Sequence, residues 1–372
     1  MNFTALATEG VRGLTPYEPG KPIEELEREL GITDSVKLAS NENPLGPSPA
    51  ALEAARRAAA HVARYPDGHG FALKQALSAR LGVAPECITL GNGSNDVLDL
   101  VARAFLGPGR SAVFSEHAFA VYPIATQAVG ARARVAPALP ADHHSQPHGH
   151  DLEALYAAVA EDTRVVFIAN PNNPTGTWVD RAGLRAFLER LSPEVLCVVD
   201  EAYAEYVEEP DYPDAARWLT DFPNLIVTRT FSKIHGLAGL RVGYGLSHPE
   251  VAGLLNRVRQ PFNVNGPAQA AALAALGDEA HVRRSRALNR RGLEQLQAAV
   301  RGLGLRWIPS VGNFLTVDLG RPAGPVYEAL LRRGVIVRPV ANYGFPNHLR
   351  VTVGTEAQNA RFLEALTEVV AQ

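Results

Sequence analysis

Four short polar clusters in the middle of the chain contain residue types that catalysis or ligand binding requires. Each cluster follows an apolar run that is typical of a buried strand. They are Gly91–Asn95, Asn170–Gly176, Asp200–Tyr203 and Thr230–Lys233. Ligands of open α/β sheets bind beyond the carboxyl ends of the strands, so we expect these clusters to line one site.

Asp200 and Lys233 are the groups with the clearest chemical potential. A carboxylate at the tip of a buried strand is costly unless a cation pairs with it, although aspartate also caps helices. Most lysines are solvated surface residues, but Lys233 stands next to Ser232 and before the apolar, glycine-rich run IHGLAGLRVG. Partial desolvation there would lower the pKa of Lys233 and make its amine a usable nucleophile.

The segment Gly91–Asn95 could bind a phosphate at the start of a helix. Its glycines allow close backbone approach, Ser94 can cap the helix, and free N–H groups there attract anions, yet a turn with an N-cap explains the same residues. The dinucleotide fingerprint G-x-G-x-x-G is absent, because Asp96 replaces the third glycine, and no Walker A sequence occurs. The prolines and glycine of Asn170–Gly176 predict a rigid turn. This turn could merely join a strand to the helix at Asp180, but three asparagines at the end of a strand favour contact with a polar ligand.

Together, the strand-end acid, the lysine and the phosphate cradle correspond to the needs of pyridoxal 5'-phosphate. This cofactor requires a Schiff-base lysine, an acid at the pyridine nitrogen and ligands for its phosphate. A nucleotide-binding dehydrogenase is disfavoured, since its fingerprint is missing. A non-catalytic binding protein would have no use for the complete set of residues.

The chain resembles the fold-type I pyridoxal-phosphate-dependent aminotransferases, and most closely their histidinol-phosphate aminotransferase branch. The similar stretches follow one another in family order over nearly the whole chain. They are VRGLTPYEPGK (11–21), KLASNENPLGPSP (37–49), RYPDG (64–68), GNGSND (91–96), HAFAVYP (117–123), NPNNPTG (170–176), VVDEAY (198–203), RTFSKIHGLAGLRVGYG (229–245) and LRVTVGT (349–355).

The resemblance assigns a role to each cofactor-binding residue. It implies that Lys233 forms the Schiff base and then moves a proton, and that Asp200 pairs with the pyridine N–H. The other implied contacts are with three parts of the cofactor: its phenolic oxygen (Tyr203 and Asn173), the face of its ring (Phe119) and its phosphate (Ser94, Asn95, Ser232 and Arg241). Tyr65 matches a tyrosine that reaches the phosphate in a neighbouring subunit, which implies a homodimer.

Substrate binding is also implied by the resemblance. Arg350 matches the arginine that binds the acidic group of the substrate, and its implied neighbours are Arg338, Tyr17 and Asn41. The branch implies transamination between histidinol phosphate and 2-oxoglutarate in histidine biosynthesis, with glutamate as the amino donor. Phenylalanine or tyrosine stays an alternative, because a guanidinium pairs with carboxylates as well as phosphates. Decarboxylation of a phosphorylated amino acid is a second alternative.

The elements that must position these residues alternate between strands and helices from about residue 85 to 250. The predicted strands are Ile88–Leu90, Ala112–Phe114, Val165–Ala169, Leu196–Val199, Leu225–Thr228 and Val242–Leu246. Helical patterns between them include Asn95–Phe105, Leu152–Ala160 and Arg181–Leu191. Because the strand runs are apolar throughout, they predict a mainly parallel α/β sheet buried on both faces.

We expect three parts: an N-terminal arm (1–40), a large cofactor-binding domain (41–265) and a smaller α+β C-terminal domain (266–372). The resemblance implies that the large domain is aspartate-aminotransferase-like. The elements predicted for the small domain are the helices Asp278–Arg301, Gly324–Arg333 and Glu356–Val370, and the strands Arg306–Ile308, Phe314–Asp318, Val335–Arg338 and Leu349–Val353.

Composition restricts the other functional classes. The 372 residues carry a formal net charge of −3 and are 46% apolar, values typical of a globular protein without a nucleic-acid-binding surface. No apolar run approaches the roughly 18 residues that span a bilayer, and MNFTALATEG does not resemble a secretion signal, so we expect a cytoplasmic protein.

Metal binding is not expected either. The two cysteines, Cys87 and Cys197, exclude by their number a disulfide scaffold or a cysteine-based zinc site. Four histidines occur between His143 and His150, but the flanking Asp, Pro and Gly residues predict an exposed loop rather than a metal site.

Overall fold

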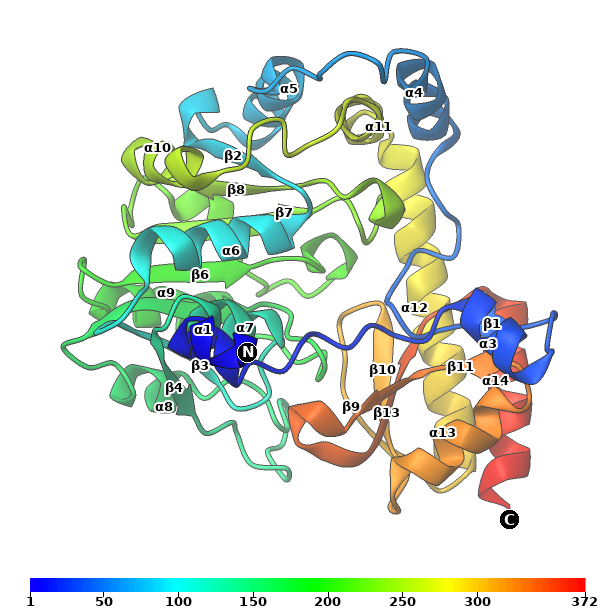
Figure 1. Cartoon of the computed structure of the whole chain (residues 1–372). Coiled ribbons are helices and arrows are strands. Elements are labelled where there is room, and N and C mark those ends of the chain that lie inside the picture. The colour runs from blue at the N-terminus through cyan, green and yellow to red at the C-terminus, as the bar shows by residue number, and fades with distance from the viewer. Residues whose placement is uncertain (372) are drawn as a thin grey trace.

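A seven-stranded sheet is the scaffold of the candidate site (Figure 1), in a computed structural model that describes residues 1–371. In spatial order its strands are β2 (Ile88–Gly91), β8 (Gly243–Ser247), β7 (Leu225–Thr230), β6 (Leu196–Asp200), β5 (Thr163–Ala169), β3 (Ser111–Ser115) and β4 (Arg132–Ala136). Strand β8 is antiparallel to both neighbours, and all other adjacent pairs are parallel. The predicted mainly parallel α/β sheet is therefore confirmed.

Helices cover both faces of this sheet, which explains why its strands lack a polar face. On β5, Val165 and Phe167 join the core on one face, whereas Val166 and Ile168 join the core on the other. The first face is covered by α6 (Ser94–Phe105), α7 (Val121–Ala128) and α10 (Pro249–Val258). The second is covered by α5 (Phe71–Leu81), α8 (Leu152–Ala157), α9 (Arg181–Arg190) and α11 (Gly266–Leu276), with α4 (Pro49–Ala59) against α11.

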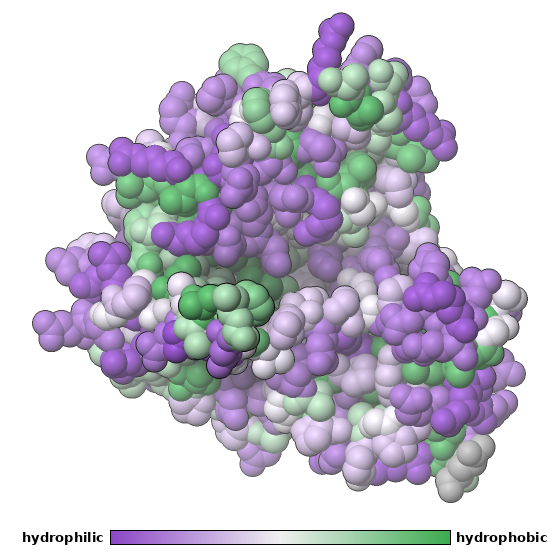
Figure 2. Space-filling view, in the orientation of Figure 1, coloured by the Kyte–Doolittle hydropathy of each residue, from purple (hydrophilic) through white to green (hydrophobic). Residues whose placement is uncertain are grey.

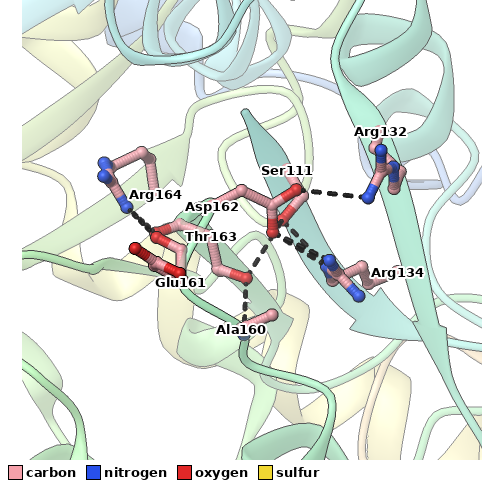
Figure 3. A network of polar contacts seen from close by, with 8 residues as sticks. All are labelled: Ser111, Arg132, Arg134, Ala160, Glu161, Asp162, Thr163 and Arg164. Atoms are coloured by element: carbon pink, nitrogen blue, oxygen red, sulfur yellow. Dashed lines mark hydrogen bonds and ion pairs between the residues drawn. The ribbon is translucent and has the colours of Figure 1, made fainter. Parts of the chain in front are cut away.

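Strand β4 was not predicted, because its sequence alternates arginine with small or apolar residues and lacks a continuous apolar run. It forms the edge of the sheet, where polar contacts hold it (Figure 3). Arg134 Nη2 lies 2.8 Å from Asp162 Oδ1, and Arg132 Nη1 lies 3.5 Å from Asp162 Oδ2. Charged side chains of this kind discourage an edge strand from pairing with another chain.

A second, antiparallel sheet lies beside the first. Its order is β12 (Arg338–Val340), β13 (Phe345–Thr352), β10 (Phe314–Asp318) and β9 (Arg306–Ile308). The helices α12 (Glu279–Gly302), α13 (Ala323–Leu331) and α14 (Glu356–Val370) pack against it and share its apolar core. The α+β character predicted for this part of the chain agrees with these elements.

One predicted strand of this region is wrong. The run Val335–Arg338 is divided between two sheets, because β11 (Val335–Ile336) pairs with β1 (Val36–Lys37), while β12 starts at Arg338 and pairs with β13. An apolar run shows that a segment is buried, but it does not show which neighbour each half will meet.

The first forty residues contact both sheets. The short helix α2 (Glu9–Arg12), which follows α1 (Phe3–Leu6), contacts α7, whereas α3 (Ile23–Leu30) and β1 lie beside the second sheet (Figure 1). Helix α11, beyond the expected boundary at residue 265, belongs to the core of the large sheet. We therefore propose that the small domain starts at α12 and recruits residues 23–38. None of the helices within residues 1–371 has the length and apolarity needed to cross a membrane.

Candidate active site

A cavity of about 290 Å³ lies at the carboxyl ends of β5, β6 and β7, next to β12 and β13. The space-filling surface is hollowed near the centre of the view, with hydrophilic residues above and to the right of the hollow and hydrophobic ones to its left (Figure 2). Thirteen of the predicted site residues line this cavity: Tyr17, Asn41, Ser94, Asn95, Phe119, Asn173, Asp200, Tyr203, Ser232, Lys233, Arg241, Arg338 and Arg350. The chain thus brings together residues that are up to 333 positions apart in sequence.

Lys233 follows the end of β7 and reaches into this cavity. Its Nζ donates a hydrogen bond to the carbonyl oxygen of Ser40 at 3.2 Å and lies 5.6 Å from the centre of the Tyr203 ring. Burial, together with the nearby charge of Arg350, lowers the pKa of Lys233 from 10.5 to about 8. The amine is therefore much more easily deprotonated than that of a surface lysine, as its apolar sequence context predicts.

Asp200 is the last residue of β6 and is only 5% exposed. It does not cap a helix. Its Oδ1 accepts a hydrogen bond from the Thr228 hydroxyl at 2.9 Å, and its Oδ2 accepts one from the Tyr122 hydroxyl at 3.0 Å. Burial raises the pKa of Asp200, whereas these two hydrogen bonds and the charge of Lys233 oppose the rise. The carboxylate thus depends on its neighbours to remain ionised.

One end of the cavity is suited to an anion. The guanidinium of Arg241 donates from Nη1 to Ser232 Oγ at 3.3 Å, close to the N-terminus of α6. A Cβ atom at Gly93 would lie 2.4 Å from Arg241 Nη2, so the glycine is what allows the guanidinium to approach the helix. A cation and a helix N-terminus together favour a phosphate.

The prediction that Ser94 caps α6 is wrong in detail. Gly93 occupies the N-cap position with φ 81°, a left-handed value, and Ser94 is the first residue of the helix. Because glycine adopts this backbone conformation without steric cost, the turn leaves the side chain of Ser94 free to line the cavity.

Arg350 is the principal cation that the small sheet contributes to the cavity. It lies on β13, is 6% exposed, and donates to Asn173 Oδ1 and to the carbonyl oxygen of Ala39. Its buried Nε has no hydrogen-bond partner among the described residues. Burial lowers the pKa of Arg350, so an anion would satisfy both its charge and its remaining donor.

Asn41 connects the arm, the small sheet and Tyr203. Its Nδ2 donates to the Tyr203 hydroxyl oxygen at 2.9 Å. Its backbone N–H donates to Thr352 Oγ1 at 2.9 Å, and the Thr352 hydroxyl donates to Asn41 Oδ1 at 3.1 Å. These contacts hold Asn41 in a left-handed conformation with φ 54° and orient Tyr203.

The aromatic residues form one wall of the cavity. The guanidinium of Arg338 lies 5.9 Å from the centre of the Tyr17 ring, which is edge-on to the Phe119 ring at 6.5 Å. Tyr65 lies elsewhere: it is 82% exposed and stacks on Phe262 at 4.5 Å. Within one chain, therefore, Tyr65 does not contribute to the cavity.

Comparisons with known proteins assign the family. The family model described as aminotransferase class I and II matches residues 33–366. The chain belongs to the class I and II aminotransferases. A Pseudomonas fluorescens protein named histidinol-phosphate aminotransferase 2 is 62% identical over 100% of this chain and 99% of its own length. Another protein of that name, from Methylococcus capsulatus, is 60% identical over 100% of both chains.

A solved structure shows the same architecture as this aminotransferase. The structure of histidinol-phosphate aminotransferase from Sinorhizobium meliloti in complex with pyridoxal-5'-phosphate matches with a TM-score of 0.89 and 31% sequence identity. The match covers 98% of this chain and 97% of the other. The predicted aspartate-aminotransferase-like fold is confirmed.

The cavity of the aminotransferase fits pyridoxal phosphate. An amine with a lowered pKa, a buried acid and an anion site line the same space. At the anion site, position 93 has no room for a residue larger than glycine beside Arg241. The expectation that this aminotransferase uses pyridoxal phosphate therefore agrees with its family and with its donor groups.

Sequence reasoning missed two residues that contact Asp200. Tyr122 reads as an ordinary core residue of α7, and Thr228 lies inside the apolar strand β7. A polar residue inside an otherwise apolar run was the available signal, because a buried hydroxyl needs a partner. The partner itself could not be read from the sequence.

The histidine-rich loop is only partly exposed, contrary to expectation. His148 packs edge-on against His117, and His150 is 6% exposed with its Nε2 2.9 Å from the carbonyl oxygen of Ala169. This contact ties the end of the loop to β5. Within residues 1–371, no group of three or more potential ligands is arranged to hold a metal ion.

Proposed function

We propose that this aminotransferase exchanges an amino group between histidinol phosphate and 2-oxoglutarate, with glutamate as the second amino compound, in histidine biosynthesis. The names of relatives at 60–62% identity over the full chain support this assignment. The observation that carries it within the site is the unpartnered Nε of Arg350, buried in a cavity that Arg338 also lines. Two guanidinium groups suit a phosphate, which offers more acceptor oxygens than a carboxylate.

The cofactor supplies an aldehyde that condenses with amines and a ring that accepts the electron pair released from the substrate carbon. The chain has to hold this group and move protons around it. We propose that Ser94, Asn95, Ser232 and Arg241 bind its phosphate, that Phe119 packs on its ring, and that Tyr203 and Asn173 bind its phenolic oxygen.

Lys233 and Asp200 would carry out the reactive roles. The Nζ of Lys233, with its pKa lowered to about 8, can accept and return a proton near neutral pH. The carboxylate of Asp200, when ionised, stabilises a protonated pyridine nitrogen and thereby the negative charge that the ring must accept. Asn41, Tyr17 and Arg338 would orient the substrate around Arg350.

A second copy of the chain is part of this proposal. Tyr65 is exposed and does not line the cavity of its own chain, so a contact between Tyr65 and a cofactor phosphate would be made in a neighbouring subunit. We therefore propose a symmetric homodimer in which each chain completes the site of the other. The proposed location is the cytoplasm, in keeping with two free cysteines.

A spectroscopic half-reaction screen tests the substrate assignment. The holoenzyme would be mixed in turn with histidinol phosphate, glutamate, phenylalanine, tyrosine and phosphothreonine, and the cofactor absorbance would be followed. We expect rapid conversion with histidinol phosphate and glutamate. A faster reaction with phenylalanine or tyrosine would replace this proposal by the aromatic alternative, and release of CO2 without consumption of a keto acid would indicate a decarboxylase.

A further inference from the structure

Tyr122 does not line the cavity, but it contacts two residues that do, Asp200 and Phe119. These are the residues proposed to bind the pyridine nitrogen and the ring face of the cofactor. Tyr122 is fully buried, and its hydroxyl donates to Asp200 Oδ2 at 3.0 Å. The edge of its ring meets Phe119, with centroids 5.9 Å apart and an interplanar angle of 87°. Its position is fixed by Phe167, which stacks on it at 4.8 Å with an interplanar angle of 7°.

The hydrogen bond from Tyr122 is one of a matched pair. Each carboxylate oxygen of Asp200 accepts one hydroxyl, from Thr228 on the neighbouring strand and from Tyr122 on α7. Hydroxyl donors favour the ionised carboxylate, whereas its burial favours the neutral acid. Asp200 is 5% exposed, so water can contribute little, and the two hydroxyls become the main neutral groups that preserve its charge.

The stacked rings make this arrangement rigid. Phe167 packs on the face of the Tyr122 ring, and α7 holds the backbone of Tyr122. A shift of Tyr122 would therefore move both the hydroxyl that donates to Asp200 and the ring that packs against Phe119. This single side chain couples the charge at one edge of the cavity to the packing on its aromatic wall.

We propose that Tyr122 is a positioning residue that, through Asp200 and Phe119, sets the protonation of the pyridine nitrogen and the seating of the ring. The inference rests on the proposed use of pyridoxal phosphate and goes beyond it, since Tyr122 itself does not line the cavity. Thr228 is its counterpart on the other carboxylate oxygen.

The test uses the holoenzyme with Tyr122→Phe, which keeps the ring and removes the hydroxyl. Its readouts are the dissociation constant of pyridoxal phosphate and the pH titration of the absorbance of the bound cofactor. We expect about tenfold weaker cofactor binding, the effect of losing one hydrogen bond to a charged group. We also expect the titration midpoint to move to higher pH, because a ring without a protonated nitrogen withdraws less electron density.

A matched control and a second variant separate positioning from simple stability. Tyr244→Phe removes the hydroxyl of another buried tyrosine, which lies on β8 and does not line the cavity, and should leave the titration unchanged. Thr228→Val removes the other donor and should shift the titration in the same direction, and Thr228→Ser should restore it.

The outcomes are distinguishable. If the unaltered chain binds no pyridoxal phosphate, the proposed function itself fails. If it binds the cofactor but Tyr122→Phe has an unchanged dissociation constant and titration, the positioning role is overturned, whatever happens to the melting temperature. If Tyr122→Phe does not fold, Thr228→Val decides: a shifted titration supports control of the cofactor through the Asp200 donors, and an unshifted one overturns it.

Discussion

Arg338 lies directly opposite Arg350 in the register of β12 and β13, and both side chains line the cavity. Like charges opposite one another in a sheet destabilise it. Their hydrogen bonds go to the carbonyl oxygens of Glu18 and Ala39 and to the side-chain oxygen of Asn173, none of which carries a charge. We expect a site built in this way to favour an anionic substrate, because such a ligand would relieve the repulsion between the two guanidinium groups.

Arg350→Ala should therefore weaken substrate binding much more than cofactor binding. We expect the KM for histidinol phosphate to rise about a hundredfold, as is typical when one partner of a buried charge pair is removed. Steady-state kinetics and the dissociation constant of pyridoxal phosphate would be measured together. Arg241→Ala is the converse control, since it should weaken cofactor retention first. Equal effects of both variants on the cofactor would contradict the separation of the two anion sites.

Lys233→Ala should abolish covalent trapping of the cofactor by borohydride. Borohydride reduces the C=N bond that a lysine amine forms with the cofactor aldehyde, and Lys233 is the lysine that lines the cavity. Mass spectrometry of the digested protein would locate any labelled peptide. Lys74→Ala is the matched control, because burial also lowers the pKa of Lys74, but that residue lies outside the cavity. Labelling that persists in Lys233→Ala would place the nucleophile elsewhere.

The pH dependence of cofactor attachment should report the pKa of Lys233. Burial disfavours its ammonium form, so the free amine predominates only above pH about 8. The rate at which pyridoxal phosphate attaches to cofactor-free enzyme should rise with pH and level off beyond that value. In Arg350→Ala the midpoint should move upwards, because the charge of Arg350 contributes to lowering the pKa. A midpoint near 10.5 in the unaltered enzyme would contradict the buried environment.

Mixing two inactive variants should reveal whether Tyr65 acts in the neighbouring subunit. Lys233→Ala and Tyr65→Ala chains would be mixed under conditions that exchange subunits. In a mixed dimer, one site would combine Lys233 of one chain with Tyr65 of the other, so activity should recover at that site. The same chains kept separate provide the baseline. No recovery despite formation of mixed dimers would show that Tyr65 does not act across an interface.

Acid should destabilise the protein through His235. Burial lowers the pKa of His235 to about 4, whereas the unfolded chain keeps the ordinary value of about 6.5. Between these values the unfolded state binds more protons, so the free energy of unfolding falls as the pH falls from 6.5 to 4.

Replacing His235 should remove this contribution. Lowering the pH from 7.5 to 4.5 should destabilise the unaltered chain more than His235→Gln. The free energy of unfolding of the variant should therefore gain about 1–3 kcal/mol relative to that of the unaltered chain over this range. Urea unfolding at both pH values would measure it. His61→Gln, at an exposed histidine, would be measured in parallel as the surface control. A constant difference for His235→Gln would mean that this histidine is not buried in its neutral form.

Much of the candidate site follows from local sequence. The continuous apolar runs of β5, β6 and β7 predict buried strands, and the polar residues after them predict which side chains reach the edge of the sheet. Asp200 and Lys233 are recognisable because their types are costly or reactive at such positions. The resemblance adds the residues outside those strands, from Tyr17 to Arg350, and all of them except Tyr65 line the cavity.

The fold class, the positions of most strands and the reactive groups could be predicted before folding was considered, because hydropathy and chemical type are local properties of a residue. It took the folded chain to show that Tyr122 and Thr228 hold Asp200, that Asn41 meets Tyr203, and that Arg338 faces Arg350. Each of these contacts depends on how distant segments pack and on the register between strands. Local patterns of polarity do not encode that geometry.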